Sequence, residues 1–151
     1  MANIEVRQAT IGDLAEAAAL FNEYRQFYGQ PSDPDGAQAF LYERFVHLES
    51  VIFLAKAGTE RETVGFMQLY PTFSSISMQR SWILNDLFVA ASARGQGAAQ
   101  ALLDAAAAYA RQTGAKGLAL STAPDNVIAQ RLYEKNGFER DAEFYHYFLR
   151  V

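Results

Sequence analysis

The sequence predicts a mixed α/β (α+β) fold, in which a mostly antiparallel sheet is flanked by about four helices. Residues 51–89 contain three apolar runs separated by short polar turns, which is the pattern of an antiparallel meander. From residue 97 onward, helical and strand patterns alternate. The 151 residues are enough for one domain with a substantial core, since a chain of this length buries roughly 70% of its unfolded surface. We therefore expect a single domain over residues 1–151.

The N-terminal part is predicted to hold a short strand and a helix. Apolar and polar residues alternate from Ile4 to Arg7, as in a half-buried strand. Thr10 followed three residues later by Asp13 resembles a capping box, with Asp in place of the usual Glu. Gly29 is suited to end the helix that follows. The apolar face of this helix is expected to carry Leu14, Ala17, Ala18, Phe21, Tyr24 and Tyr28.

A second helix is predicted after the turn-rich residues 30–36. Asp33 is suited to be its N-cap and Pro34 its first helical residue. We expect this helix to end near Ser50. Its apolar face is expected to carry Ala37, Leu41, Phe45 and Leu48.

The strands of the meander are expected at Val51–Ala57, Val64–Phe73 and Arg80–Val89. Pro71 lies near the end of the second strand, where it can bend the backbone or remove a ladder hydrogen bond. The elements expected after the meander are a helix from Gly97 to Thr113 ended by Gly114, a strand from Leu118 to Thr122, a helix capped by Asp125 or Asn126 and ended by Gly137, and a strand from Phe144 to Val151.

Composition excludes several classes of function. Because the chain has no cysteine, it has no disulfide, thiolate metal site or cysteine nucleophile. His47 and His146 lack metal-ligand spacing, so we expect no metal. The formal net charge of −4 argues against nonspecific nucleic-acid binding. No apolar run approaches the roughly 20 residues of a membrane span, and the first residues do not resemble a signal peptide. We therefore expect a cytoplasmic protein that binds neither nucleic acid nor membrane.

The segment from Trp82 to Ala99 carries the clearest functional pattern. An apolar strand runs into a turn of small residues, and a helix is expected directly after it. Small residues let a backbone approach a ligand closely. Unpaired N–H groups at a helix start, together with the helix dipole, favour a phosphate. The residues of this predicted phosphate cradle are Arg94, Gly95, Gln96, Gly97, Ala98 and Ala99.

Several phosphate loops share these features. A P-loop requires Lys and Ser or Thr after its last glycine, where this sequence has Ala98 and Ala99. A dinucleotide fingerprint requires a third glycine, where Gln100 stands. A tight strand-to-helix turn without any ligand also fits these six residues alone. Arg94, Gly97 and Ala99, however, match the Arg/Gln-x-x-Gly-x-Gly/Ala pattern of the GNAT superfamily of N-acetyltransferases.

A second segment, Ser121 to Phe138, resembles the other hallmark of that superfamily. The expected elements agree with the superfamily along the whole chain, and the strand Leu84–Val89 is similar to its diamine and histone-type branches. The resemblance implies a sheet that splays at the cofactor site, and an enzyme that uses acetyl-coenzyme A as co-substrate. The residues that match this second hallmark are Asn126, Ala129, Leu132, Tyr133, Gly137 and Phe138.

The resemblance also implies roles for particular residues. The backbone N–H groups of the phosphate cradle would hold the diphosphate of the coenzyme, and Leu87, Phe88 and Val89 would pair with its pantetheine arm. Asn126 would contact a pantetheine amide. Tyr133 would lie beside the thioester sulfur and protonate the departing thiolate, whose parent thiol has a pKa of about 8.5.

The amine acceptor must lose a proton before it attacks. A primary amine has a pKa of about 10.4, so its deprotonation at pH 7 costs roughly 4.6 kcal/mol. Relatives often place a Glu on the strand before the cradle. Here Asn85 stands at the closest equivalent position and cannot act as a base. Asp86 is adjacent and could serve if a β-bulge turned it toward the cleft; an ordered water is the alternative. Direct attack in a ternary complex is expected, because no Cys or Ser nucleophile motif is present.

The acceptor is expected to bind near the first two helices and the loop at residues 73–79, as the resemblance implies. The sequence leaves open whether the acceptor is a small amine or polyamine, or a protein lysine or N-terminus. A catalytically silent acyl-coenzyme A-binding module is the non-enzymatic alternative, and a homodimer is also left open. The candidate walls of the acceptor site, each of which core packing also explains, are Tyr24, Tyr28, Tyr70 and Phe73.

Overall fold

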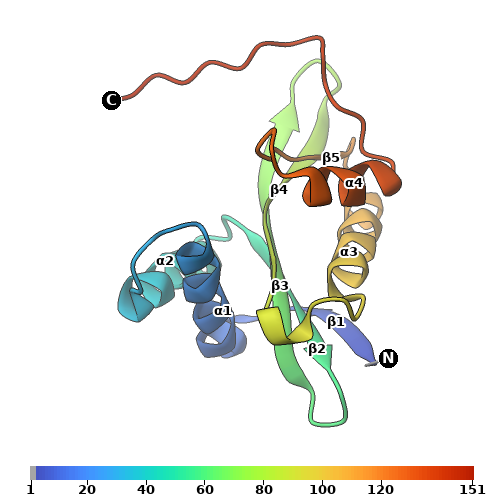
Figure 1. Ribbon diagram of the computed structural model, residues 1–151. Coiled ribbons are helices and arrows are strands. Elements are labelled where there is room, and N and C mark those ends of the chain that lie inside the picture. Colours follow the sequence, from blue (N-terminus) through green and yellow to red (C-terminus); the bar gives the residue numbers. More distant parts are fainter. Residues whose placement is uncertain (1–2) are drawn as a thin grey trace. The chain divides into compact units, whose positions relative to one another are not determined.

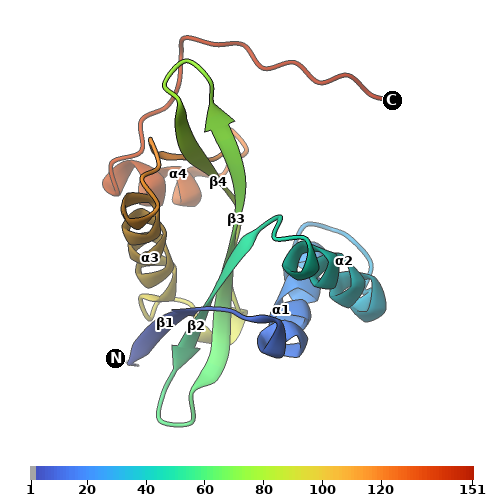
Figure 2. The ribbon, with the colours of Figure 1, turned by 180° about the vertical axis from the view of Figure 1, so that it is seen from behind.

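The computed structural model describes residues 3–151 (Figures 1 and 2). The chain divides into two compact units, one ending at Leu120 and the other beginning at Ser121. The helices and strands are, in chain order, β1 (Ile4–Gln8), α1 (Leu14–Phe27), α2 (Pro34–Val46), β2 (Val51–Ala57), β3 (Glu62–Ser74), β4 (Gln79–Val89), α3 (Ala98–Gln112), β5 (Leu118–Ala119) and α4 (Val127–Lys135).

Within residues 3–151, a single five-stranded sheet has the order β1-β2-β3-β4-β5. The pairs from β1 to β4 are antiparallel, whereas β5 runs parallel to β4. The predicted mixed α/β class with a mostly antiparallel sheet is therefore confirmed. β5 pairs only with Trp82 and Ile83 of β4. Among the described residues, no strand pairs with the outer edge of β4 from Leu84 to Val89, so the sheet is open there.

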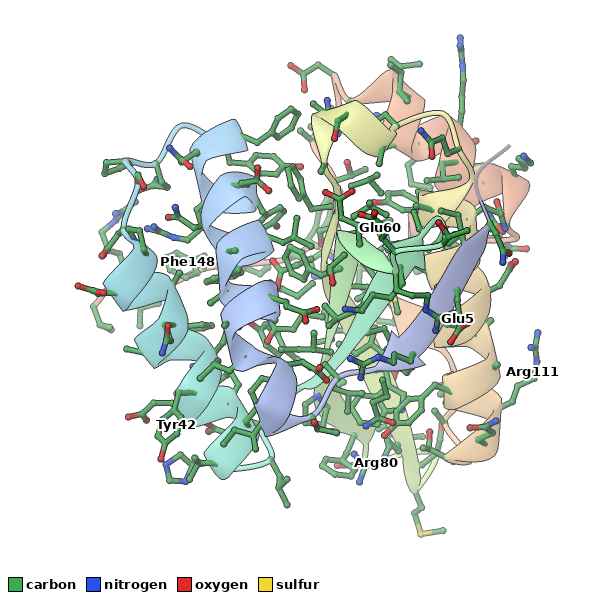
Figure 3. The ribbon with its side chains drawn as sticks, turned by 90° about the horizontal axis from the view of Figure 1, so that it is seen from below. Glu5, Tyr42, Glu60, Arg80, Arg111 and Phe148 are labelled. Carbon is green, nitrogen blue, oxygen red and sulfur yellow. The ribbon has the colours of Figure 1, made fainter. Side chains whose placement is uncertain are left out.

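Helices cover both faces of the sheet in the first unit. α1 and α2 lie over one face and α3 lies over the other (Figures 1 and 3). Every residue of β2 from Ile52 to Lys56 is buried, since a strand covered on both faces needs no polar side. The core under α1 and α2 includes Ala17, Leu20, Phe21, Leu41, Ile52, Leu54 and Phe66.

On the opposite face, α3 contributes a stripe of buried residues at helical spacing. The ring of Tyr109 lies 5.4 Å from that of Phe53 and 5.3 Å from that of Trp82, between centroids. Burial of a large apolar side chain, such as Leu102 of α3, contributes about 1.5–3 kcal/mol to the stability of the fold. Arg111, at the outer side of the same helix, points away from the sheet (Figure 3). The buried residues of the stripe are Leu102, Leu103, Ala106 and Ala110.

Side-chain hydrogen bonds fix the start of α2, as predicted, and the turn of 3-10 helix at Ile11–Asp13 that leads into α1. Asp33 accepts the N–H of Gly36 at 3.0 Å, and Pro34 opens α2. The carboxylate of Asp13 accepts the N–H of Thr10 at 2.9 Å.

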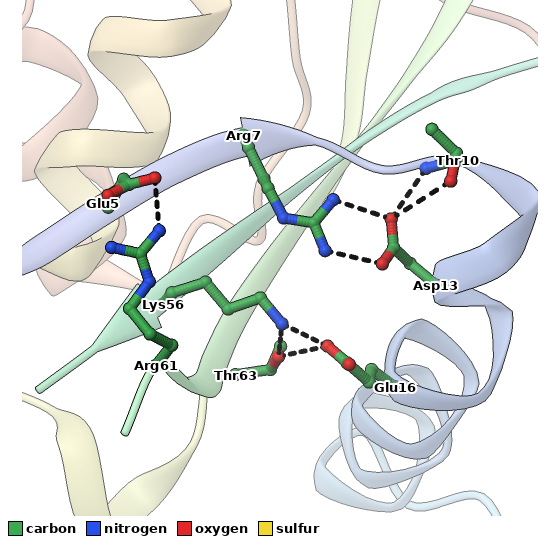
Figure 4. Close-up of polar contacts among 8 residues, drawn as sticks. All are labelled: Glu5, Arg7, Thr10, Asp13, Glu16, Lys56, Arg61 and Thr63. Atoms are coloured by element: carbon green, nitrogen blue, oxygen red, sulfur yellow. Dashed lines mark hydrogen bonds and ion pairs between the residues drawn. The ribbon is translucent and has the colours of Figure 1, made fainter. Parts of the chain in front are cut away.

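Ion pairs join the start of α1 to the sheet. Arg7 on β1 holds Asp13 with two hydrogen bonds, of 2.6 and 2.9 Å (Figure 4). Buried Lys56 on β2 contacts both Glu16 and Thr63 in the same region. These contacts therefore anchor the first turn of α1 over β1 and β2.

Two sequence predictions about element ends are wrong. α2 ends at Val46, before the predicted end near Ser50, because Leu48 adopts a left-handed φ of 54° that closes the helix. Leu48 is 85% exposed and does not extend the apolar face. β5 ends at Ala119 instead of Thr122.

The predicted final strand from Phe144 to Val151 does not form in this structure. Residues 139–151 are extended, but none of them belongs to the sheet. A strand requires a neighbour that accepts and donates its backbone hydrogen bonds, and this segment has none among the described residues.

Candidate functional site

The turn between β4 and α3 depends on two glycines in a left-handed conformation. Gly95 has φ 79°, and Gly97, the N-cap of α3, has φ 88°. Residues with a side chain rarely adopt such values. A Cβ added at either position would meet no atom within 4 Å. The glycines are therefore required by the backbone conformation, and the space beside them is open.

Five of the six predicted backbone N–H groups of the phosphate cradle, those of residues 95–99, are free to bind a ligand, whereas the N–H of Arg94 donates to the carbonyl oxygen of Ala91 at 3.5 Å. Among the hydrogen bonds of the described residues, none uses an N–H of residues 95–99 as a donor. The first N–H groups of a helix have no intrahelical acceptor, and the helix dipole makes this end favourable for an anion. The residues present therefore fit a diphosphate held by main-chain hydrogen bonds.

The side chain of Arg94 is held at the end of β4. Its Nε donates a hydrogen bond of 3.1 Å to the carbonyl oxygen of Val89. Its guanidinium lies over the rings of Phe27 and Phe88, 5.2 and 5.8 Å from their centroids. Arg94 thereby links the start of the cradle to the end of α1.

β4 contains a β-bulge beside the predicted catalytic residues. Gln68 of β3 pairs with Asp86, while the next residue, Leu69, pairs with Leu84. Asn85 is therefore an extra residue on β4. A single extra residue reverses the face to which the following side chains point.

The packing partners on either side of the bulge show this reversal. Before the bulge, Trp82 packs against Tyr109 of α3. After it, Phe88 packs against Tyr24 of α1, although the two β4 residues are an even number of positions apart. Asp86 shares the face of Phe88, because it lies two residues before it. The bulge thus turns Asp86 toward α1.

The carboxylate of Asp86 is buried and hydrogen-bonded. It is 4% exposed and accepts hydrogen bonds from Gln68 Nε2 at 2.7 Å and Asn85 Nδ2 at 3.2 Å. The Tyr24 hydroxyl is close enough to the carboxylate to lower its pKa. Burial raises the pKa of Asp86 above its ordinary value, and these three neighbouring groups only partly oppose that increase. A carboxyl with a raised pKa is better matched to taking a proton near neutral pH.

Two of the predicted acceptor residues, Tyr24 and Tyr70, lie near this carboxylate, and a third, Tyr28, lies beside Tyr24. Tyr24 and Tyr70 are half-buried, and burial together with the Asp86 charge raises the pKa of both hydroxyls, to about 12 for Tyr70. The exposed ring of Tyr28 lies edge-on to Tyr24 at 5.1 Å between centroids. Both buried hydroxyls therefore remain neutral at physiological pH.

The fourth predicted acceptor residue, Phe73, does not join this group. It lies near the far end of β3 and is exposed, with the guanidinium of Arg80 4.9 Å from its ring centroid. The structure therefore associates Phe73 with the β3–β4 hairpin.

Sequence reasoning missed Gln68. This side chain is fully buried, and its Oε1 has no hydrogen-bond partner among the described residues. The available signal was a single polar residue inside the apolar run Val64–Tyr70. A buried polar side chain is informative because it needs hydrogen-bond partners.

The second unit contains the remaining predicted site residues. Asn126 is the N-cap of α4, and its side-chain oxygen accepts a hydrogen bond from the N–H of Ala129 at 3.3 Å. Of the two predicted caps, Asp125 and Asn126, the helix is therefore capped by Asn126. Tyr133 lies within α4, and its ring packs edge-on against Phe138 at 5.8 Å between centroids.

Two features are absent from the part of the chain that the structure describes. Residues 3–151 contain no group of three or more His, Cys, Asp or Glu side chains arranged to hold a metal ion. None of the described helices combines the length and apolar character needed to cross a membrane.

Known proteins resemble this chain over its full length. The model of the acetyltransferase (GNAT) family matches residues 17–138. An uncharacterized N-acetyltransferase of Bacillus subtilis (strain 168), YhfO, is 53% identical over 148 residues, which is 98% of each chain. The crystal structure of a probable acetyltransferase has a TM-score of 0.93 and 47% identity, covering 97% of both chains. Aminoglycoside N-acetyltransferase AAC(6')-Iy in complex with coenzyme A shares the fold, with a TM-score of 0.79, 23% identity, and coverage of 100% of this chain and 97% of that one.

Proposed function

Because this chain belongs to the acetyltransferase (GNAT) family, we propose that it transfers the acetyl group of acetyl-coenzyme A to the amine of a small molecule or polyamine. The observation that carries this proposal is the bulge at Asn85, which turns the buried carboxylate of Asp86 toward α1. The reaction runs by direct attack of the amine, since the chain contains no cysteine to carry an acyl group.

The coenzyme binds at the cradle and along the splayed edge of β4. The free N–H groups of residues 95–99 bind its diphosphate, and the main chain of residues 87–89 pairs with its pantetheine arm, because no strand of the described chain covers that edge. Asn126 contacts a pantetheine amide. When bound, acetyl-coenzyme A supplies the thioester that donates the acetyl group.

Asp86 is the general base. A protonated amine has a pKa of about 10.4, so the base must offset roughly 4.6 kcal/mol at pH 7. The raised pKa of Asp86 reduces this mismatch, and a positioned base contributes roughly 10²–10⁴-fold to the rate. Asp86 takes one proton from the bound ammonium group, which frees the lone pair of the nitrogen to attack the acetyl carbon. The carbon–sulfur bond breaks as Tyr133 donates a proton to the sulfur, and the second proton that the nitrogen loses restores the Tyr133 hydroxyl. Asp86 then releases its proton to solvent.

Gln68 assists the proton transfer in two ways: its amide nitrogen holds the carboxylate of Asp86, and its amide oxygen accepts a hydrogen bond beside that carboxylate. Its Nε2 bonds to the carboxylate, while its buried Oε1 has no partner among the described residues. An unsatisfied buried acceptor costs about 1–3 kcal/mol. An N–H of the acceptor amine, or a water that relays its proton, satisfies this oxygen.

The aromatic surroundings of Asp86 suit a small cationic acceptor. Tyr24 packs edge-on against Phe66 at 5.6 Å and Phe88 at 6.0 Å between centroids, and Tyr70 lies close enough for the Asp86 charge to raise its pKa. Aromatic faces attract an ammonium group, and the carboxylate among them adds a negative charge. A protonated amine is thus bound first and deprotonated afterwards by the same group.

The function is tested by incubating the protein with acetyl-coenzyme A and a panel of small monoamines, polyamines and lysine peptides, with release of free thiol as the readout. We expect acceptor-dependent thiol release from a small amine or polyamine. Release of free thiol with the lysine peptides but with none of the small amines would show that the acceptor is a protein. Coenzyme binding without release above the hydrolysis background would identify a catalytically silent module.

A further inference from the structure

Arg44 of α2 is a partly buried cation on the side of the sheet toward which Asp86 is turned. Its side chain is 21% exposed, and its guanidinium lies 4.4 Å from the centroid of the Phe40 ring. Phe40 in turn stacks on Phe21 of α1, at 5.6 Å between centroids, and Phe21 belongs to the core under α1 and α2. These contacts hold the guanidinium over the same face of the sheet as the proposed base.

Tyr70 is the residue near which this cation and the proposed base meet. Phe66, Gln68 and Tyr70 alternate along β3 and share one face. This is the α1 face, because Phe66 packs edge-on against a ring of that helix. Burial, followed by the charge of Asp86, raises the pKa of the Tyr70 hydroxyl, whereas the charge of Arg44 lowers it. A negative and a positive side chain therefore both lie near one hydroxyl.

The register of β2 and β3 is consistent with this placement of Arg44. Arg44 Nε donates a hydrogen bond of 3.1 Å to the side chain of Glu49, two residues before β2 begins. Val51, the first residue of β2, pairs with Leu69, and Tyr70 is the next residue of β3. Because the two strands are antiparallel, the residues before Val51 approach those after Leu69. The ion pair thus comes close to Tyr70.

Arg44 retains hydrogen-bond donors for an anion. A guanidinium carries five N–H donors. The ion pair uses Nε and Nη2, and both contact the same oxygen of Glu49. Within residues 3–151, no hydrogen bond uses Nη1 of Arg44. Glu49 is 53% exposed at the side chain, and an exposed ion pair contributes little to stability. A second carboxylate can therefore bind Arg44 at little cost.

We propose that the acceptor is a small amine that also carries a carboxylate, that is, an amino acid, with its ammonium group at Asp86 and its carboxylate at Arg44. This inference rests on the proposed function and names the acceptor class of the same site. An arginine fork matches the two oxygens of a carboxylate. A polyamine would instead bring a second positive charge toward Arg44, and like charges repel at short range. Arg44 is thus a specificity-determining residue.

Matched acceptors test this selection. Each amino acid is compared with the alkylamine that has the same number of carbons: glycine with ethylamine, β-alanine with propylamine, and γ-aminobutyrate with butylamine. The diamine putrescine is compared with butylamine, and the readout is kcat/KM from the release of free thiol. We expect the best amino acid to exceed its alkylamine at least tenfold, which is about 1.4 kcal/mol, and putrescine to fall below butylamine. Alkylamines equal to or better than every amino acid would overturn the proposal.

Variants of Arg44 show whether its charge causes the preference. Arg44→Gln should reduce the ratio of the two kcat/KM values to within twofold of unity, mainly through a higher KM for the amino acid. Arg44→Lys retains the charge and should keep part of the preference. The matched control is Arg111→Gln, an exposed arginine of α3 that points away from the sheet, and it should show the parental ratio (Figure 3). A parental ratio in a folded Arg44→Gln would also overturn the proposal.

Binding measured without turnover separates this inference from the proposed reaction. The same matched pairs are titrated by calorimetry into protein saturated with coenzyme A. We expect the best amino acid to bind at least tenfold more tightly than its alkylamine. Such binding without thiol release would support this inference and contradict the proposed function, whereas thiol release with equal affinities in every pair would support the proposed function and overturn this inference.

Discussion

Gln68 on β3 donates a hydrogen bond of 2.7 Å to Asp86 on β4, beside the position where the register of the two strands shifts. The shift makes Asn85 the extra residue and turns Asp86 toward α1. The hydrogen bond then holds the carboxylate in a site where it is 4% exposed. One irregularity of the sheet thus creates both the position of the proposed base and its unusual environment.

Replacing the proposed base should abolish most of the activity without damaging the fold. Asp86→Asn keeps the shape of the side chain and should lower kcat by roughly 10²–10⁴-fold, the usual contribution of a general base. Coenzyme affinity and the thermal midpoint should not decrease, because a buried charge is removed. The matched control is Asp104→Asn, an exposed carboxylate on α3, which should leave kcat unchanged. A kcat for Asp86→Asn within twofold of the parent would remove Asp86 from this role.

The pH profile should report the titration of Asp86. A base acts only when it is unprotonated, so kcat/KM should be present above the pKa of Asp86 and fall as the pH decreases through it. Because burial raises that pKa, the acidic limb should lie above the ordinary aspartate value of about 3.9. Any activity that remains in Asp86→Asn should lack this limb. An identical limb in the variant would assign the titration to another group.

Tyr133 should affect turnover more than binding. Tyr133→Phe removes the hydroxyl that protonates the departing thiolate and should lower kcat by roughly 10²–10⁴-fold, with the dissociation constant of coenzyme A unchanged. Tyr42→Phe is the control, since Tyr42 is an exposed tyrosine on α2 that points away from the sheet (Figure 3). Unchanged kcat in Tyr133→Phe would exclude the hydroxyl as the acid.

The ion pair at the start of α1 should stabilise the protein except at low pH. The hydrogen bonds from Arg7, followed by that from the Thr10 N–H, lower the pKa of Asp13 to about 2. Its contribution to the free energy of unfolding is therefore present above about pH 4 and is lost as the pH falls toward 2. We expect Asp13 to contribute about 1–2 kcal/mol to the free energy of unfolding. Solvent screening limits this contribution, because the side chain of Arg7 is 41% exposed.

Urea unfolding of the parent and Asp13→Asn at pH 7 and pH 2 measures this contribution. The difference between the two proteins should be present at pH 7 and small at pH 2. Glu60→Gln, an exposed carboxylate, should show no difference at either pH. A constant difference at both values would assign the effect of Asp13→Asn to the helix cap alone.

The elements of the fold could be predicted from the sequence wherever a local signal coincided with packing. Asp33 and Pro34 start α2, and Asn126 caps α4, because caps depend on neighbouring residues only. The end of α2 could not be predicted from the apolar pattern. Leu48 continues that pattern, but its backbone is left-handed and its side chain is exposed.

The candidate site could be predicted only in part. Small residues in sequence mark the turn at Gly95 and Gly97, so this part was predictable. The direction of Asp86 depends on a register shift between β3 and β4, which no local signal in β4 specifies. The segment 144–151 was predicted as a strand from its residue types, but a strand also requires a neighbour, and none of the described residues provides one.

The central claim is that the N–H groups at the start of α3 bind the diphosphate of the coenzyme. Calorimetric titration of coenzyme A into Gly97→Glu and Gly58→Glu tests it most directly. Both glycines have a left-handed φ, 88° and 73°, and open space beside them, but only Gly97 belongs to the cradle. The claim predicts no measurable binding to Gly97→Glu, because a side chain and a negative charge enter the phosphate site, and parental affinity for Gly58→Glu. Parental affinity for a folded Gly97→Glu would contradict it.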